Sequence, residues 1–467
     1  MTLQSDDQTD RIACWGISMG GVRFGLAALL SVALASYVAW AEPSIFPTGT
    51  TRYDPGKAYN SFILFSGADD ETYLIDMNGK VVHRWGYVGF PAGMLDPKLT
   101  GGKRGHVVLQ LAQTAGVATG VNPGLPAMFS NKTLGELDWD GKVVWHWGDA
   151  APGGAARQHH DWQRLANGNT LVLANLYHPI AGFALSSLLD DVIYEVTPAG
   201  EIAWQWIAGD HLGEFGFSDA ELALVHAVKE PDYLHLNSMR TLGPNHWFEG
   251  GDRRFDPDNI MISSRNASII AIVDKKTGHI VWRLGPHYAP SRPPGPPHLP
   301  SEIDQISGQH DPHIIPEDLP GAGNLLVFDD QGEAGYPPAP LKVFPGSRVL
   351  EIDPVKNEIV WEYTGTSNDR DPWSFYSSFI SDARRLPNGN TFIDEGMDGR
   401  FFQVTQKGEI VWEYVSPFFG REGSKRPLSN QVYRAQPVPY DWAPAGTPHG
   451  EHPVVPPDLA GFHVPAQ

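Results

Sequence analysis

Residues 136–147 read ELDWDGKVVWHW, a pattern of strand, tight turn and strand. Apolar and polar residues alternate on either side of Asp140-Gly141, and an Asp-Gly pair supplies the positive φ angles that a two-residue hairpin turn requires. Five related segments occur elsewhere in the chain, each with a turn near its middle and a short apolar run near its end. The six copies are Leu74–Trp85, Glu136–Trp147, Glu195–Trp206, Ile272–Leu284, Glu351–Tyr363 and Gln403–Tyr414. We therefore expect six similar hairpins.

One position is aligned in all six copies and sets their spacing. It is occupied by His83, Trp145, Trp204, Trp282, Trp361 and Trp412, at intervals of 51 to 79 residues. Such intervals hold one four-stranded blade and a loop of variable length. A second hairpin motif precedes several copies, at Leu165–Leu171, Leu319–Leu325 and Leu386–Phe392. Two hairpins in each of six repeats predict an all-β fold, a six-bladed β-propeller, in preference to unrelated hairpins in a sandwich.

We expect three parts in the chain: a signal peptide at residues 1–41, the propeller as a catalytic domain at 42–435, and a Pro-rich tail at 436–467. In the leader, Arg23 precedes an apolar run at 24–38, and residues 39–41 read Ala-Trp-Ala before Glu42. Met19 is an alternative start. The run is short for a membrane span, so we expect cleavage and a periplasmic or otherwise exported protein. The alternative is an uncleaved N-terminal anchor.

Composition limits the function classes. The formal net charge of −20 argues against a nucleic-acid partner, because such partners need a basic surface. The single cysteine, Cys14, lies in the leader, so disulfides and thiol catalysis are excluded for a mature chain that has lost it.

Three histidines stand at similar places in three repeats. His160 and His235 precede the third and fourth copies, and His310 precedes the fifth. The innermost strands of a propeller line its central channel, so we expect these side chains to point at one axis. Convergent histidines could ligate a divalent metal, act as acid and base, or include a covalent nucleophile. Asn237 and Arg265 lie nearby in sequence, and a guanidinium suits a tetrahedral anion better than a metal cation.

The repeats, the His-Asp…Asn-Gly-Asn segment, His235-x-Asn-Ser with its downstream Ser-Ser-Arg265, and Gln-His310 resemble the bacterial arylsulfate sulfotransferase family. The similarity runs from about Tyr53 to Pro417. It implies an exported six-bladed propeller that moves a sulfuryl group from an aryl sulfate to a phenol, with its site at the channel centre and no cofactor. Some members carry an N-terminal β-domain or a disulfide, for which this chain has no counterpart, so the oligomeric state does not carry over.

The resemblance also implies roles for single residues. His310 matches the family nucleophile, which becomes transiently sulfated. His235, Asn237 and Arg265 match further catalytic residues, as does His160, with His159 as the competing candidate. A neutral imidazole would attack sulfur, Arg265 and Asn237 would hold the sulfuryl oxygens, and His235 or His160 would move the phenol proton.

Aromatic residues could stack on the aryl group or belong to the core; the candidates for substrate binding are Trp162, Phe375 and Tyr376. The competing functions are a metal-dependent propeller hydrolase or lyase and a non-catalytic binding propeller. We expect small-molecule donor and acceptor partners, no nucleic acid, no metal, and no stable membrane span once the leader is cleaved.

Overall fold

The computed structural model describes residues 47–113, 131–285, 306–332, 345–420 and 429–456. They belong to one compact unit that begins at Ala41. The expected signal peptide lies outside the described residues. Within these ranges, no helix is both long enough and apolar enough to cross a lipid bilayer.

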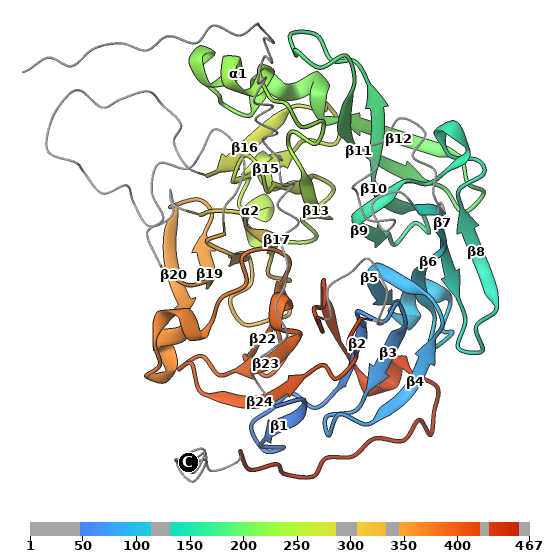
Figure 1. Ribbon diagram of the computed structural model, residues 1–467, viewed down its shortest axis with the longest axis vertical. Coiled ribbons are helices and arrows are strands. Elements are labelled where there is room, and N and C mark those ends of the chain that lie inside the picture. The colour runs from blue at the N-terminus through green and yellow to red at the C-terminus, as the bar shows by residue number, and fades with distance from the viewer. Residues whose placement is uncertain (1–46, 114–130, 286–305, 333–344, 421–428, 457–467) are drawn as a thin grey trace, which may run out of the picture. The chain divides into compact units, whose positions relative to one another are not determined.

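The described strands form six antiparallel sheets in a ring, which confirms the six-bladed β-propeller (Figure 1). The strands of each blade are given from the innermost outward: blade 1 is β25 (Ala435–Val438), β2 (Phe62–Ser66), β3 (Thr72–Ile75) and β4 (Val81–Trp85), and blade 2 is β5 (Val88–Met94), β6 (Val107–Gln113), β7 (Asn131–Leu137) and β8 (Val143–Trp147). Blade 3 is β9 (Gln158–Arg164), β10 (Thr170–His178), β11 (Leu188–Val196) and β12 (Ile202–Ile207), and blade 4 is β13 (Leu236–Thr241), β14 (Ile260–Ser264), β15 (Ile269–Val273) and β16 (Ile280–Leu284). Blade 5 is β17 (His310–Ile314), β18 (Leu325–Asp329), β19 (Arg348–Asp353) and β20 (Glu358–Tyr363), and blade 6 is β21 (Asp382–Arg385), β22 (Thr391–Glu395), β23 (Arg400–Val404), β24 (Ile410–Val415) and the added edge strand β1 (Gly49–Tyr53). Two short α-helices, α1 (Asp219–His226) and α2 (His246–Glu249), lie in the connections.

The six repeated segments form the outer hairpin of each blade, as the sequence predicts. In every copy the aligned position pairs with the first residue of the segment, for example Trp204 with Glu195 and Trp412 with Gln403. A register shift follows immediately in all six hairpins. Each repeat therefore carries the same β-bulge, which increases the local twist of the hairpin.

The repeated tryptophans connect neighbouring blades. Four indole Nε1–H groups donate to a backbone carbonyl in the outer turn of the next blade: Trp204 to Lys275 at 3.1 Å, Trp282 to Pro354 at 3.0 Å, Trp361 to Gln406 at 2.9 Å and Trp412 to Met77 at 2.8 Å. The last of these bonds joins blade 6 to blade 1. The tryptophan recurs in sequence because four of the six blades use it for the same contact with the next blade.

The ring closes with strands from both ends of the described chain. In blade 1, β2 pairs on one side with β3 and on the other with β25, so the inner strand comes from the C-terminal part. The expected limit between propeller and tail at residue 435 falls inside β25, and the propeller strand continues to Val438. The strand β1 pairs with β24 and extends blade 6. Tyr53 at its end also forms a bridge with Val454 in the expected tail.

Hydrophobic side chains pack between adjacent blades. Six buried clusters of the described residues each draw on two neighbouring blades, for example Trp147 of blade 2 with Tyr194 of blade 3. Fully burying one such side chain contributes about 1.5–3 kcal/mol. The blades are therefore held by apolar contacts, and the innermost strands are left free to carry polar side chains.

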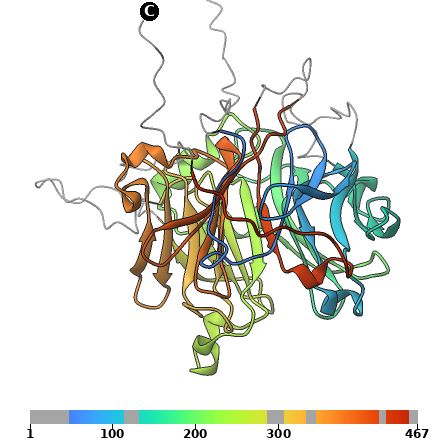
Figure 2. The ribbon, with the colours of Figure 1, turned by 90° about the horizontal axis from the view of Figure 1, so that it is seen from below.

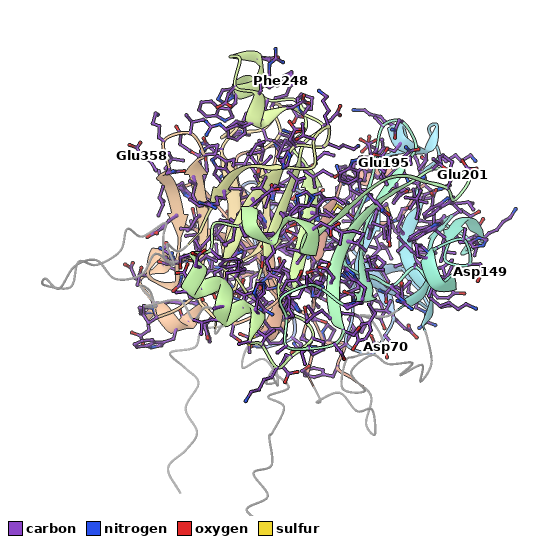
Figure 3. The ribbon with its side chains drawn as sticks, turned by 90° about the horizontal axis from the view of Figure 1, so that it is seen from above. Asp70, Asp149, Glu195, Glu201, Phe248 and Glu358 are labelled. Atoms are coloured by element: carbon purple, nitrogen blue, oxygen red, sulfur yellow. The ribbon has the colours of Figure 1, made fainter. Side chains whose placement is uncertain are left out.

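The ring has two faces, and the chain direction tells which one the histidines are near. Asp70, in the turn between β2 and β3, and Phe248, in α2, lie at opposite faces (Figure 3). The helix α2 projects from its face in the edge-on view (Figure 2). Because β13 runs toward α2, His235 at its start lies nearer the opposite face.

Candidate active site

The predicted histidines lie at β-bulges where three inner strands begin. His160 is in β9, His235 directly precedes β13, and His310 begins β17. The register shifts at this end of β9, β13 and β17. His160 and His235 have φ angles of 53° and 51°, and Asp311 has 52°. Left-handed backbone is uncommon for residues other than glycine, and it concentrates at functional sites, where it re-aims side chains.

The bulges bring the three imidazoles together. The ring centroids of His160 and His235 are 4.6 Å apart. Tyr433 lies between blades, with its ring centroid 5.5 Å from His160 and 6.5 Å from His310. His160 is only 3% exposed and His310 only 1%. Residues far apart in sequence therefore form one buried polar cluster.

Hydrogen bonds define the tautomer of His310. Its Nδ1 donates to Oδ2 of Asp330 at 2.8 Å, and its Nε2 accepts the N–H of Ile380 at 3.2 Å. Burial lowers the pKa of His310 well below its usual value, and Arg265 and Arg434 lower that pKa further. The imidazole is therefore neutral at pH 7, with the proton on Nδ1 and the lone pair on Nε2.

The other two histidines have different partners. His235 Nδ1 donates to Oδ2 of Asp232 at 2.6 Å. His160 Nδ1 lies 2.7 Å from Nδ1 of His159, whose Nε2 lies 3.3 Å from Asp191. Burial lowers the pKa of His160 well below its usual value and that of His159 to about 3. Of the two neighbours, His160 is the one whose ring lies against His235, whereas His159 contacts Asp191 in β11 of the same blade.

Arg265 and Asn237 belong to the same cluster. Arg265 Nη2 donates to the carbonyl of Ser378 at 3.4 Å, and burial lowers the pKa of its guanidinium, an effect opposed by Asp330 and Asp232. Asn237 Nδ2 donates to the carbonyl of Gln309 at 2.7 Å. That nitrogen has a second N–H, and the Oδ1 atom of the same amide is buried without a hydrogen bond. The cluster thus combines a fixed cation with an amide donor, a pairing that suits an anion.

The match to a protein family is consistent with this donor set. The family model Arylsulfotransferase (ASST) matches residues 50–417, which is most of the chain. The chain belongs to the arylsulfotransferase family. No curated protein matches the chain. The family match confirms the resemblance seen in the sequence.

Solved structures resemble this family member only distantly. A protein of unknown function from Bacteroides caccae matches with 13% identity and a TM-score of 0.43, covering 81% of this chain and 99% of its own. Sqt1 of Saccharomyces cerevisiae matches with 10% identity and a TM-score of 0.33, covering 76% of this chain and 71% of its own. Likenesses at this level carry no information about activity.

Sequence reasoning missed four residues of this arylsulfotransferase site. Asp330 is hydrogen-bonded to His310, and Asp232 is hydrogen-bonded to His235. Tyr433 and Arg434 belong to the segment just before β25. The Tyr433 hydroxyl donates to the backbone carbonyls of His160 and Asn237, at 3.0 and 2.9 Å. No local pattern marks Tyr433 and Arg434, because the pairing of β25 with β2 results from ring closure.

The three aromatic candidates have different surroundings. Phe375 is 1% exposed and packs against Phe328, Tyr363 and Phe402 in the core between blades 5 and 6, so it is a core residue. Trp162 donates its indole N–H to the carbonyl of Pro91 at 2.9 Å and lines a different cavity. Tyr376 is the one of the three near the cluster, because it acts electrostatically on Arg265.

On the side of the histidines that faces α2, arginine and aspartate side chains alternate across the channel. Arg434 Nη1 lies 3.1 Å from Asp161 and 3.3 Å from Asp311, and Arg384 Nη2 lies 2.6 Å from Asp311. Burial raises the pKa of Asp382 to about 7. A cavity of about 460 Å³ follows toward the α2 face, with Trp162, Arg240, Arg384, Arg434 and Trp442 in its lining. The charged layer separates this cavity from His160 and His310.

The three channel histidines do not form a converging metal-ligand set. Among the residues that the structure describes, the group whose donor atoms all lie within 4.8 Å of one another is His211, Glu214 and His279, at the outer edge of the ring. Within the channel, Nδ1 of His235 and of His310 already bind carboxylates. Such bonds also occur on metal-bound histidines, so what distinguishes the channel cluster from the outer one is the wider spacing of its donor atoms.

Proposed function

We propose that this arylsulfotransferase family member transfers a sulfuryl group from an aryl sulfate to a phenolic acceptor through a sulfated His310. The observation that carries the proposal is the pair of bonds on His310. Asp330 holds the proton on Nδ1, so Nε2 keeps its lone pair, and burial keeps the ring neutral at pH 7. A neutral imidazole with one oriented lone pair is a nucleophile.

In the first half-reaction, the Nε2 lone pair attacks sulfur and the N–S bond forms as the S–O bond to the aryl group breaks. The electron pair of that bond leaves on the phenolate oxygen. The hydrogen bond from Ile380 to Nε2 must lengthen as the lone pair turns toward sulfur. Burial raises the pKa of Asp330, and Arg265 opposes that shift. Positive charge developing on the ring favours the ionised form of Asp330, which in turn stabilises that charge.

Arg265 and Asn237 are the groups that hold the sulfuryl oxygens. Asn237 is fully buried and Arg265 is partly buried beside the histidines, so both act where contact with water is reduced. Donors fixed where charge develops stabilise a transition state without reorganisation. This role explains why a cation lies next to His310, although it further lowers the pKa of that imidazole.

His235 is the proton carrier in this proposal. Asp232 binds its Nδ1 at 2.6 Å, which positions the ring. His160 is a poorer candidate, because burial lowers its pKa well below the usual value. His235 gives a proton to the leaving phenolate and then takes one from the acceptor phenol. The acceptor oxygen attacks sulfur, the N–S bond breaks, and neutral His310 is restored.

Two half-reactions through one covalent intermediate predict ping-pong kinetics. The donor and acceptor are small aryl molecules, and the chemistry requires no cofactor. We also propose that residues 1–41 direct export to the periplasm, on the basis of their leader-like pattern. N-terminal sequencing of the protein recovered from producing cells tests this, and Glu42 is the expected first residue.

The central test uses 4-nitrophenyl sulfate with and without a panel of phenols. We expect phenol-accelerated release of 4-nitrophenol, which His310→Ala abolishes. The matched control is His313→Gln, since His313 is a buried histidine of the same strand. Labelling with ³⁵S donor should mark wild-type protein at alkaline pH, where sulfo-histidine is stable. Absence of release with every acceptor, or unchanged release by His310→Ala, overturns the proposal.

A further inference from the structure

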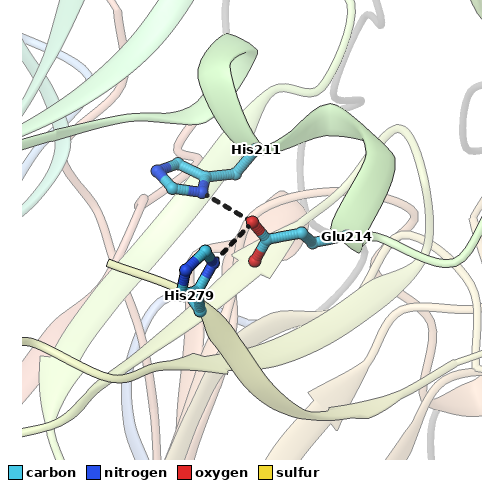
Figure 4. A group of neighbouring side chains, drawn as sticks. All are labelled: His211, Glu214 and His279. Atoms are coloured by element: carbon cyan, nitrogen blue, oxygen red, sulfur yellow. Dashed lines mark hydrogen bonds and ion pairs between the residues drawn. The ribbon is translucent and has the colours of Figure 1, made fainter. Parts of the chain in front are cut away.

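A second cluster of histidines lies at the outer edge of the ring. It consists of His211 and Glu214 in the 3₁₀ helix η4 (Ala208–Glu214), which follows β12, and His279, which directly precedes β16 (Figure 4). The strands β12 and β16 are the outermost strands of blades 3 and 4. We propose that His211, Glu214 and His279 form a divalent transition-metal site that connects these two blades.

The donor atoms already face one point. His211 Nδ1 lies 3.0 Å and His279 Nδ1 2.9 Å from the same Oε1 atom of Glu214. Around tetrahedral Zn²⁺, with metal–ligand distances of about 2.0–2.2 Å, neighbouring donor atoms lie about 3.3–3.5 Å apart. An outward movement of a few tenths of an ångström in each pair therefore makes room for the ion. The three donors come from two blades, so they are not close merely because they are neighbours in sequence.

Surrounding contacts orient the ligands. The backbone N–H of Ile280 donates to Oε2 of Glu214 at 2.7 Å, which leaves Oε1 directed at the two imidazoles. The His211 ring stacks on Trp206 with centroids 5.2 Å apart and planes 12° apart. Trp206 is fixed in turn by a bond from its indole N–H to the carbonyl of Gly278, at 2.9 Å. Supporting contacts of this kind raise metal affinity by reducing the freedom of the ligands.

The donor set indicates the metal class. Two imidazole nitrogens and one carboxylate oxygen suit Zn²⁺ and its neighbours, whereas Ca²⁺ and Mg²⁺ prefer oxygen ligands. The His279 side chain is 67% exposed, against 19% for His211 and 30% for Glu214. Water can therefore supply the remaining coordination position. The site lies on the outermost strands and the channel histidines on the innermost ones, so the inference does not depend on the proposed sulfuryl transfer.

The experiment is titration of untagged, chelator-treated full-length protein with Zn²⁺ by calorimetry, and with Co²⁺ by visible absorption. We expect one ion per chain, tetrahedral Co²⁺ bands, and a melting temperature that rises with Zn²⁺ concentration. His279→Gln removes an exposed ligand with little risk to folding, and it should weaken affinity at least tenfold and abolish the Co²⁺ bands. His146→Gln, an exposed histidine of blade 2, should change neither.

Two results overturn the inference. One is the absence of stoichiometric Zn²⁺ binding by the folded wild-type protein, which would leave the cluster as a set of hydrogen bonds. The other is wild-type affinity in His279→Gln together with Glu214→Gln, which would place any bound ion elsewhere. Neither result bears on the sulfotransferase assay, so the two proposals succeed or fail separately.

Discussion

Replacing Asp330 by Asn tests whether the proton on His310 determines the reaction. The carboxylate accepts the Nδ1–H of His310 at 2.8 Å, and the N–H of Ile380 points at Nε2 on the other side of the ring. An amide has nearly the same shape, yet it can present either an oxygen or an N–H to Nδ1. In the second orientation the proton moves to Nε2, and the attacking lone pair is lost.

Two effects set the size of the loss. A hydrogen bond to a charged group contributes about 1.5–3 kcal/mol, against about 1 kcal/mol for a neutral one. The difference of about 0.5–2 kcal/mol corresponds to a rate loss of roughly 2- to 30-fold. Where the same substitution leaves a catalytic histidine of a serine protease in the wrong tautomer, turnover falls about 10⁴-fold. We therefore expect kcat/KM to fall by roughly 2- to 30-fold while Nδ1 keeps its proton, and toward about 10⁴-fold if the wrong tautomer predominates.

The assay is stopped-flow release of 4-nitrophenol without acceptor, where wild-type protein should show a burst equal to the enzyme concentration. Asp330→Asn should slow this burst, and thermal melting should show that the variant is folded. Asp329→Asn is the matched control, because Asp329 is equally buried but pairs with Arg348 rather than with His310. A folded Asp330→Asn protein with a burst rate equal to that of wild type would refute the assigned tautomer.

Three further predictions concern the anion site, the ring and the pH response. Arg265→Lys should lower kcat by about 10²–10³-fold, since one preorganised donor is lost from the sulfuryl group, and steady-state kinetics with 4-nitrophenyl sulfate measure this. Trp412→Phe removes the 2.8 Å bond to Met77 and should lower the free energy of unfolding by about 1–3 kcal/mol in urea titrations. Trp145→Phe should lower it less, because the Trp145 Nε1 atom has no hydrogen-bond partner among the residues that the structure describes. Burial lowers the pKa of His313 to about 3, so the unfolded chain protonates this group below about pH 6.5 while the folded protein does not. Relative to His313→Gln, wild type should therefore lose about 1.4 kcal/mol of stability per pH unit from about pH 6.5 down to about pH 3, and a constant difference between the two at pH 7 and pH 5 contradicts this.

The fold was predictable because similar turn and strand residues recur in the outer hairpin of each blade. The turn signals and the aligned tryptophans are short-range features, and the bond from Trp282 to Pro354 shows what the repeated residue does. The limit of the last strand was not predictable in this way. Nothing local to Ala435–Val438 indicates that it pairs with Phe62–Ser66, because that pairing results from ring closure.

The site was predictable only in part, for the same reason. His160 and His310 share a register within their repeats, so their convergence follows from the propeller itself. In blade 4 that place is taken by Asn237, and His235 lies two residues before it. Asp330 and Asp232 are not repeated, and their roles depend on bulge geometry that brings each carboxylate onto one imidazole nitrogen. Phe375 was misleading because an aromatic residue close to the site in sequence can lie between two blades instead.

The placement of Tyr433 has a consequence for how the protein is made. The ribosome completes His160, His235 and His310 long before it reaches Tyr433 and Arg434, which contact them from the segment leading into β25. A chain released before Tyr433 would carry His160, His235 and His310 and still lack the side chains of Tyr433 and Arg434. If the proposed reaction holds, we expect such a truncated chain to be inactive.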